Sequence, residues 1–303
     1  MTRIAFREVR RLRFIRLACD IVVDARSLQI ELAAKRLLDA SRLYQAALQR
    51  SYRQTGKISS QEIAENHIDV AGALGLLRIH EGVAEPRAGA VALSAFDERT
   101  ATMELTLGER VQFLDRLLTI EPCLDEVRGI FSKIREVHEA APSDFRGVVK
   151  NDRVVKSHLD WLVDLRLVGA TRGSRGKFHL TSLGEKVQLA MTDRGDRFLP
   201  AVMASYVADD LGRLTTARPP DPKVRDAILK GAARVMKRVP SPVDPKLVPG
   251  EPVLLIARLI LLTEARFYIG FAELLAVVEE SAQTWGIYFS WNRGYKSGHF
   301  RLP

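Results

Sequence analysis

Two clusters of cationic and hydroxyl side chains between residues 143 and 189 have the chemistry of a phosphate-binding site. The first lies at the start of a predicted helix, and the second surrounds the glycines of a predicted loop. The residues concerned are Arg153, Lys156 and Ser157 in the first cluster, and Arg172, Arg175 and Lys177 in the second. Guanidinium and ammonium groups pair with phosphate oxygens, so both clusters favour contact with a polyanion. A nucleotide-binding phosphate loop is excluded, because Gly173 to Lys177 lacks the full glycine-to-lysine spacing and a following Ser or Thr.

Two helices and a β-hairpin would position these clusters. Ser, Asn and Asp side chains accept hydrogen bonds from the free N–H groups at a helix start, so they mark where each helix begins. The candidates are Ser143 or Asp144 for a short first helix, and Asn151 or Asp152 for a second helix from about Arg153 to Leu165. Apolar runs at residues 167–170 and 178–180 flank the glycine-rich loop and predict the hairpin. The alternatives are an ordinary solvated helix face and a plain surface hairpin.

A similar but weaker cluster lies near the end of the chain. Arg293, Tyr295 and Lys296 stand in a glycine-bearing loop between two predicted strands, residues 287–291 and 299–302. Aromatic rings interleaved with cations suit sugar–phosphate contact or base stacking. The alternative is that most of the aromatic side chains in the adjoining strands fill a small core.

The start of the chain is strongly basic. Residues 1–57 contain 13 Lys and Arg and 5 Asp and Glu, which gives 13 − 5 = +8 of the total net charge of +9. Arg10, Arg11 and Arg13 lie in its densest part, and the region is predicted to be helical throughout. One interpretation is an arm that follows a phosphate backbone. The other is an amphipathic helix packed on the body of the protein with its arginines outward.

Composition limits the class of protein. The chain has 303 residues, of which 47% are hydrophobic and 27% charged, as in globular proteins. The net charge of +9 favours nucleic acid as a partner over a membrane surface. The most apolar run, Val253 to Leu262, contains Arg258 and is too short to span a bilayer. Two isolated cysteines, Cys19 and Cys123, and the absence of a visible secretory signal predict a cytoplasmic, nucleoid-associated protein.

Part of the sequence is repeated. With an offset of 91 residues, Ile68 and Asp69 align with Leu159 and Asp160. Further along the chain, residues 103–113 echo residues 178–189 around a shared Leu-Gly-Glu. In the first copy, a short helix is predicted from Ser59 to Glu62, a second from His67 to Leu77, and a long wing over residues 81–99. This copy is less basic, which favours protein contact there.

The predicted fold is mainly α with small β-hairpins, in the α+β class, as tandem domains behind an N-terminal helical arm. The expected divisions are 1–55 (basic helical region), 56–120 (unit 1), 121–195 (unit 2), 196–250 (helical and proline-rich connection) and 251–303 (unit 3). The connection is placed where the proline density is highest, and it contains a basic helical patch at residues 223–238.

The helix-turn-helix followed by a hairpin resembles the winged-helix superfamily over about two-thirds of the chain. In that family the second helix of the motif and the wing touch DNA. The resemblance therefore implies double-stranded DNA contact by Arg153, Lys156, Ser157, Arg172, Arg175 and Lys177, with Arg293, Tyr295 and Lys296 as a weaker set. The superfamily also includes units that bind only protein.

These observations lead to two hypotheses. The first is a DNA-binding protein: a regulator, a replication initiator, or the DNA-reading subunit of a defence or mobile-element system. The second is a scaffold subunit of a DNA-processing complex whose winged-helix units bind partner proteins. No enzyme, metal site or cofactor is predicted, because the six histidines show no metal-ligand spacing and Gly184-Glu185-Lys186 fits a helix start better than a nuclease motif. A membrane partner is not expected, and homo-oligomerisation stays open.

Overall fold

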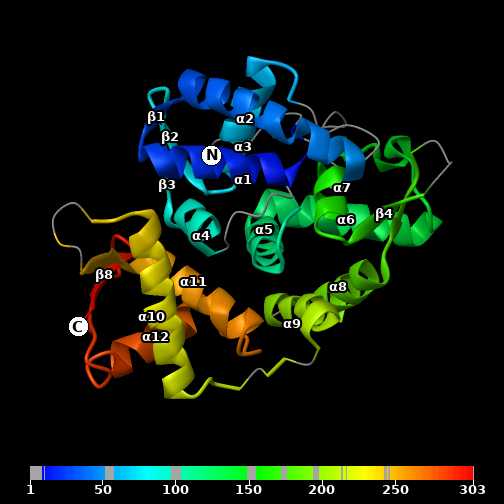
Figure 1. The fold of residues 1–303 in the computed structure, drawn as a ribbon. Coiled ribbons are helices and arrows are strands. Elements are labelled where there is room, and N and C mark those ends of the chain that lie inside the picture. Colours follow the sequence, from blue (N-terminus) through cyan, green and yellow to red (C-terminus); the bar gives the residue numbers. More distant parts are fainter. Residues whose placement is uncertain are drawn as a thin grey trace.

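The computed structural model describes residues 9, 11–51, 58–96, 104–148, 155–171, 176–193, 198–212, 214–215, 217–241, 244 and 246–302. The described chain is mainly helical with small antiparallel sheets, as the sequence predicts (Figure 1). Three groups of elements follow one another, and we call them the first module (residues 12–86), the second module (residues 121–180) and the third module (residues 221–301).

The first module has two helices with a short strand between them, then a third helix and a hairpin. Its elements are α1 (Leu12–Ala25), β1 (Leu28–Gln29), α2 (Ile30–Ser51), α3 (Gln61–Ala73), β2 (Leu77–His80) and β3 (Val83–Pro86). The strand order is β1-β3-β2, with Leu28 opposite Ala84 and Leu77 opposite Pro86. The sheet thus crosses the boundary expected at residue 55, and β1 interrupts the region expected to be entirely helical.

The second module repeats this order in shortened form. Its elements are α6 (Glu121–Val137), the 3-10 helix η1 (Pro142–Phe145), α7 (Val155–Asp164), β4 (Val168–Ala170) and β5 (Phe178–Leu180). Ala140 takes the place of the first strand, since it pairs with Phe178 of β5, and β5 also pairs with β4. The predicted hairpin is confirmed.

The third module has the order once more. Its elements are α10 (Asp221–Arg238), β6 (Leu247–Pro249), α11 (Gly250–Thr263), α12 (Phe271–Ser281), β7 (Tyr288–Asn292) and β8 (Ser297–Arg301). The strand order β6-β8-β7 matches that of the first sheet. The module therefore begins with α10, which lies in the region expected to be a connection between domains.

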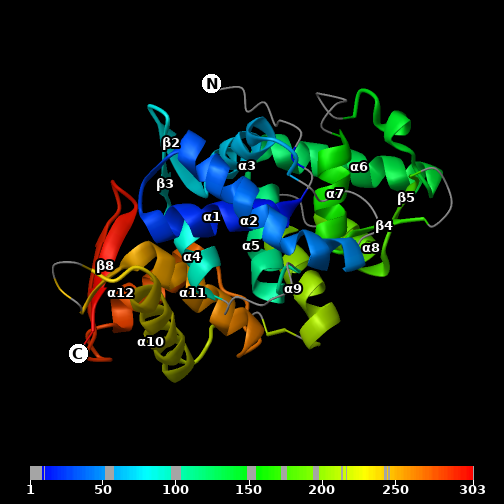
Figure 2. The same ribbon diagram turned by 45° about the horizontal axis from the view of Figure 1, so that its top comes forward.

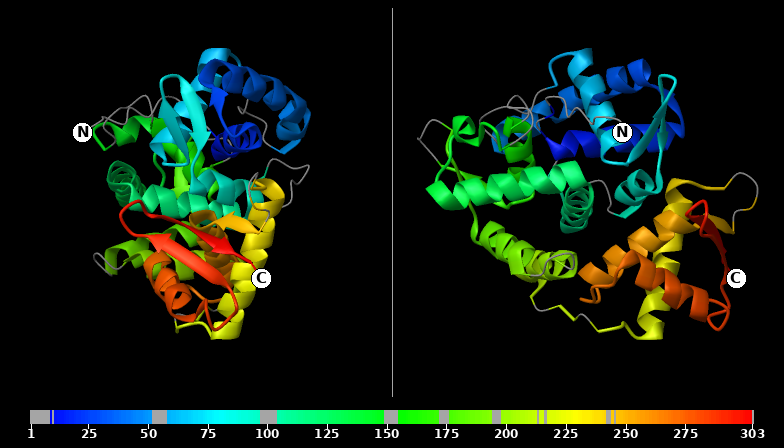
Figure 3. Two further views of the ribbon diagram at one scale, coloured as in Figure 1. Left: turned by 90° about the vertical axis from the view of Figure 1, so that its left-hand side faces the viewer. Right: turned by 180° about the vertical axis from the view of Figure 1, so that it is seen from behind.

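Four further helices join the modules. They are α4 (Ala88–Phe96), α5 (Leu107–Thr119), α8 (Ser182–Asp193) and α9 (Phe198–Leu211). Helix α4 packs against α1, α10 and α11, so it lies between the first and third modules, and α8 packs on α9 (Figures 1 and 3). The long wing expected at residues 81–99 is therefore wrong: the hairpin turns within two residues after His80, and the apolar, alanine-rich stretch that follows is α4.

Two other local expectations for the first copy are wrong. Residues 61–73 form one continuous helix, capped by the Ser60 hydroxyl, in place of a short helix and a second one from His67. Residues 104–106, expected to belong to a strand, form no regular element, while residues 101–103 lie outside the described part.

The repeated Leu-Gly-Glu has the same structural position in both copies. Gly108 and Gly184 are buried in the first turns of α5 and α8. A Cβ added at Gly108 would lie 2.0 Å from the Phe96 ring, and one at Gly184 would lie 2.0 Å from the Leu167 carbonyl oxygen. These distances are far below van der Waals contact, so the helix can approach its neighbour only with glycine here.

Candidate interaction surface

The residues predicted to contact DNA fall into three sets in the structure. Arg10, Arg153, Arg172 and Arg175 lie outside the described residues, so their roles stay predictions. Three others are buried: Arg11, Arg13 and Ser157. The remaining five are exposed: Lys156, Lys177, Arg293, Tyr295 and Lys296.

The expected surface roles of Arg11, Arg13 and Ser157 are wrong, because helix packing takes all three side chains out of solvent. Every residue from Arg11 to Asp20 is buried, so α1 begins as a central helix of the protein and not as a free arm (Figure 1). The Ser157 side chain is 0% exposed on α7. Charges counted along one helix do not reveal which other parts of the chain cover them, and here the start of α1 contacts Trp161 and Asp164 near the end of α7.

A single carboxylate organises the contact between α1 and α7. Asp164 accepts hydrogen bonds from Arg11 at 2.8 Å and from the backbone N–H of Leu12 at 3.0 Å, and it lies 3.4 Å from Arg13. The indole of Trp161 donates to the carbonyl oxygen of Val9 at 2.8 Å. Asp164 was expected on a solvated stripe; it is instead the buried counter-ion of two arginines.

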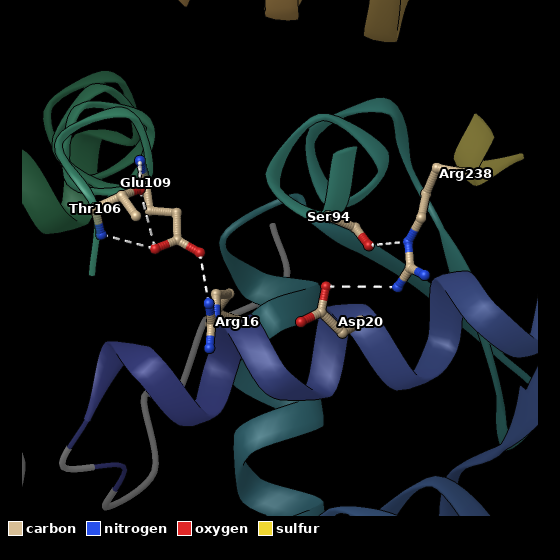
Figure 4. A network of polar contacts seen from close by, with 6 residues as sticks. All are labelled: Arg16, Asp20, Ser94, Thr106, Glu109 and Arg238. Carbon is tan, nitrogen blue, oxygen red and sulfur yellow. Dashed lines mark hydrogen bonds and ion pairs between the residues drawn. The ribbon is translucent and has the colours of Figure 1, made fainter. Parts of the chain in front are cut away.

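A second buried ion pair joins α1 to α5 (Figure 4). One carboxylate oxygen of Glu109 accepts a hydrogen bond from Arg16 at 2.9 Å. The other accepts from the backbone N–H of Thr106 at 2.8 Å, which completes a capping box at the start of α5. Glu109 therefore fixes the start of α5 and its distance from α1 with one side chain.

A third set of polar contacts joins the first and third modules. Arg238 on α10 lies 2.6 Å from Asp24 and 3.8 Å from Asp20, both on α1, and it donates to the Ser94 hydroxyl on α4 (Figure 4). Arg234, one turn earlier, donates to the Phe96 carbonyl oxygen at 3.0 Å. The basic patch expected on this helix thus serves largely to hold modules together.

These contacts connect α1 to the second module, to α5 and to the third module, and those with Asp164 and Glu109 are buried. Charged groups out of water are tolerated only when they are paired and hydrogen-bonded, and removing one partner costs about 3–5 kcal/mol. This role of Asp20, Glu109, Asp164 and Arg238 was not predicted from the sequence. Their only local signal is the density of charge on otherwise apolar helices, which solvated faces share.

The third helix of each module, where a helix-turn-helix reads DNA, carries few cations. Helix α3 contains no Lys or Arg and exposes Gln61 and Glu62 at its start. Helix α7 exposes only Lys156 among its described side chains, and α12 exposes three glutamates and no cation: Glu273, Glu279 and Glu280. The acidic face of α12 would repel a phosphate backbone.

Apart from Lys156, the exposed cations among the predicted contact residues lie on two hairpins. Lys177 lies just before β5, with Glu139 at 3.8 Å. Arg293, Tyr295 and Lys296 form the turn between β7 and β8, where Tyr295 is 83% exposed and Arg293 pairs with Glu279 at 2.8 Å. This turn is the one predicted site whose three residues are all described and all exposed.

Burial shifts the pKa of several titratable side chains in the described part of the chain. Burial raises the pKa of the Cys19 thiol far above its usual range and that of Cys123 to about 12, so both thiols stay protonated and unreactive. Burial lowers the pKa of His67 to about 4, and its ring lies against Phe14. In the described part of the chain, no group of three or more His, Cys, Asp or Glu side chains is arranged to hold a metal ion.

The chain was compared with protein-family models, with curated proteins and with solved structures, and none of them matches it. Among the described helices, none combines the length and the apolar character needed to cross a membrane.

Proposed function

We propose that the chain is a scaffold subunit of a DNA-associated protein assembly, built from three winged-helix modules held in a fixed arrangement. The order helix, strand, helix, helix, strand, strand occurs three times, and each time the last strand lies between the other two. That order supports the winged-helix resemblance. It also places the beginning of the first module at α1 and that of the third module at α10.

The observation that carries this proposal is the character of the third helices. A helix that reads the major groove needs an accessible face with hydrogen-bond donors and a favourable potential for phosphate. Helix α7 is covered, α12 is acidic, and Lys156 is the one cation among the described residues of α3, α7 and α12. The geometry therefore favours modules that bind proteins over modules that read base sequence.

The experiment compares DNA binding and protein binding by the full chain. Fluorescence anisotropy with duplexes of unrelated sequence should show weak, sequence-independent binding that falls steeply as salt rises. Affinity capture from a lysate treated with nuclease should still recover a defined set of proteins. Tight binding of one duplex sequence in preference to others at physiological salt would contradict the scaffold proposal and support a sequence-specific DNA-binding protein.

A second candidate function, sequence-independent contact with duplex DNA, is favoured by the exposed cations of the hairpins. The hairpins of the second and third modules lie at opposite ends of the molecule (Figures 1 and 2). They would thus touch separate stretches of phosphate backbone, and a duplex too short to reach both ends would gain only one contact.

Duplex length is therefore the test of this second candidate. Affinity should rise sharply once the duplex is long enough to span both hairpins, because the second contact becomes intramolecular. The double variant Lys177→Ala with Lys296→Ala should abolish that rise and flatten the salt dependence. An affinity that grows only in proportion to the number of sites on longer DNA would exclude joint contact by both hairpins.

A further inference from the structure

The third sheet has one buried face and one open face. One residue from each strand faces the core, and the three lie side by side: Val248, Phe300 and Phe289. The ring centroids of Phe289 and Phe300 are 4.5 Å apart. Residues alternate along a strand, so their neighbours face the other way. The outer face is formed by Leu247, Pro249, Tyr288, Ser290, Asn292, Ser297, His299 and Arg301.

This outer face presents flat rings to solvent. Tyr288 is 60% exposed, and its ring lies 5.9 Å from the half-buried His299 ring. The turn that extends from the same two strands adds Tyr295, which is 83% exposed. Few large apolar side chains are as open as these two tyrosines in the described part of the chain, and both belong to this hairpin, which lies in front of the helices in Figure 3 (left).

The charge of the outer face suits an anion. The three strands contribute Arg301 and no carboxylate to it, and the turn adds Arg293 and Lys296. Carboxylates of the described residues lie at its margins: Asp244 lies 3.4 Å from Arg301, Glu279 lies 2.8 Å from Arg293, and Glu251, at the start of α11, is close enough to Lys296 to interact with its charge. Both arginines are well exposed, and such ion pairs contribute little, so the guanidinium groups stay available to phosphate.

We infer that the outer face of the β6-β8-β7 sheet and its turn bind single-stranded nucleic acid. Stacking on Tyr288 and Tyr295 requires bases whose faces are free, which a duplex does not offer, while Arg293, Lys296 and Arg301 would contact the backbone. A five-residue strand is about 13 Å long from first to last residue, enough for about two or three nucleotides. This inference does not rest on the scaffold function, which concerns protein partners.

The test measures binding of labelled twelve-nucleotide oligothymidine and oligouridine to the full chain at low salt. Tyr288→Leu and Tyr295→Leu remove the rings, while Tyr288→Phe and Tyr295→Phe keep them. Because all four changes are on exposed side chains, thermal unfolding should stay unchanged. Each leucine variant should weaken binding at least about fivefold and each phenylalanine variant should not. Lys35→Ala, an exposed cation on α2 in the first module, is the matched control and should have little effect.

Two competitors, polyglutamate and a DNA duplex of the same length, test whether the face binds any polyanion or duplex DNA in place of a single strand. Strong preference for the single strand over both, with protection of Tyr288 and Tyr295 from chemical modification, supports the inference. Equal competition by polyglutamate, or leucine variants that bind as well as the native chain, would show that the face attracts any polyanion and would overturn it. Absence of binding at low salt overturns it as well, and leaves the capture of partner proteins unaffected.

Discussion

The carboxylate of Asp164 accepts a hydrogen bond from the backbone N–H of Leu12 at 3.0 Å, so the last residue of α7 caps the first turn of α1. A helix is usually capped by a side chain just before it, but Arg11 at that position supplies no such bond. The same carboxylate neutralises Arg11 and Arg13. Formation of the central helix is therefore coupled to the position of the second module.

Replacement of Asp164 by alanine should destabilise the protein strongly. The change removes a carboxylate that pairs with the buried Arg11 and Arg13, and it removes the cap of α1, which should cost about 3–5 kcal/mol. Asp164→Asn should cost less, because an amide oxygen can still accept from Leu12. Urea titration gives the free energy of unfolding of each variant.

Asp209→Ala is the control for this prediction. Asp209 also pairs with a cation, Lys186 at 3.1 Å, but both side chains are about half exposed, so the loss should stay below about 1 kcal/mol. If Asp164→Ala proves as mild as Asp209→Ala, Asp164 does not hold α1 in place.

The pair of Arg16 and Glu109 should show strong coupling. Arg16→Met or Glu109→Gln alone removes one partner of a buried ion pair, and each should cost about 3 kcal/mol. The double variant should cost clearly less than the sum, because neither charge remains. Glu185, at the equivalent position of the repeat, is exposed, so Glu185→Gln should change stability by less than about 0.5 kcal/mol. Additive effects in the cycle would mean that the ion pair is not what fixes α5.

Gly184→Ala should be more harmful than its small size suggests. The new methyl group would meet the Leu167 carbonyl oxygen at 2.0 Å, and a backbone atom cannot rotate away, so the cost should be about 1–3 kcal/mol or more. At Gly270 a Cβ meets nothing within 4 Å, so Gly270→Ala should be nearly neutral. Thermal unfolding of Gly184→Ala and Gly270→Ala tests this prediction. Equal midpoint temperatures for the two variants would mean that α8 can move away from Leu167 without cost.

Local patterns predicted much of the fold. The hairpins at residues 168–180 and 288–301 follow from short apolar runs and glycine-bearing turns, which act over a few residues. The repeated Leu-Gly-Glu correctly pointed to equivalent helix starts at α5 and α8. The first strand of each module was not predicted. It has only one to three residues, as at Ala140, which is too few to show an alternation of apolar and polar side chains.

Burial of charge could not be predicted in the same way. The partner of Arg11 is Asp164, which lies 153 positions away along the chain. A basic helix looks the same in sequence whether its arginines meet phosphate or a buried aspartate. The exposed turn at Arg293 and Lys296 was accessible to prediction, because a glycine-bearing turn between strands lies at the surface whatever packs behind it.

His67 gives the chain a predictable sensitivity to acid. Burial lowers its pKa to about 4, against 6.5 in an unfolded chain, and its Nδ1 lies 2.7 Å from the Ile63 carbonyl oxygen, to which the neutral ring donates. As pH falls below 6.5 the unfolded chain binds a proton that the folded chain refuses. Stability should therefore be lost between pH 6.5 and pH 4, by about 3 kcal/mol in total, with no further loss from this group at lower pH.

His67→Gln isolates this contribution, because an amide can donate to the same carbonyl oxygen without titrating. The free energy of unfolding should be measured in urea at several pH values from 7 to 4.5. The carboxylates that titrate in this range are the same in both proteins, so their contribution cancels in the comparison. As pH falls, the free energy of unfolding should therefore decrease more steeply for the native chain than for His67→Gln. His80→Gln, at an exposed histidine of the same module, should follow the native curve. Parallel curves for the native chain and His67→Gln would mean that the ring reaches water, and that the packing of α3 on α1 around Phe14 is looser than the structure has it.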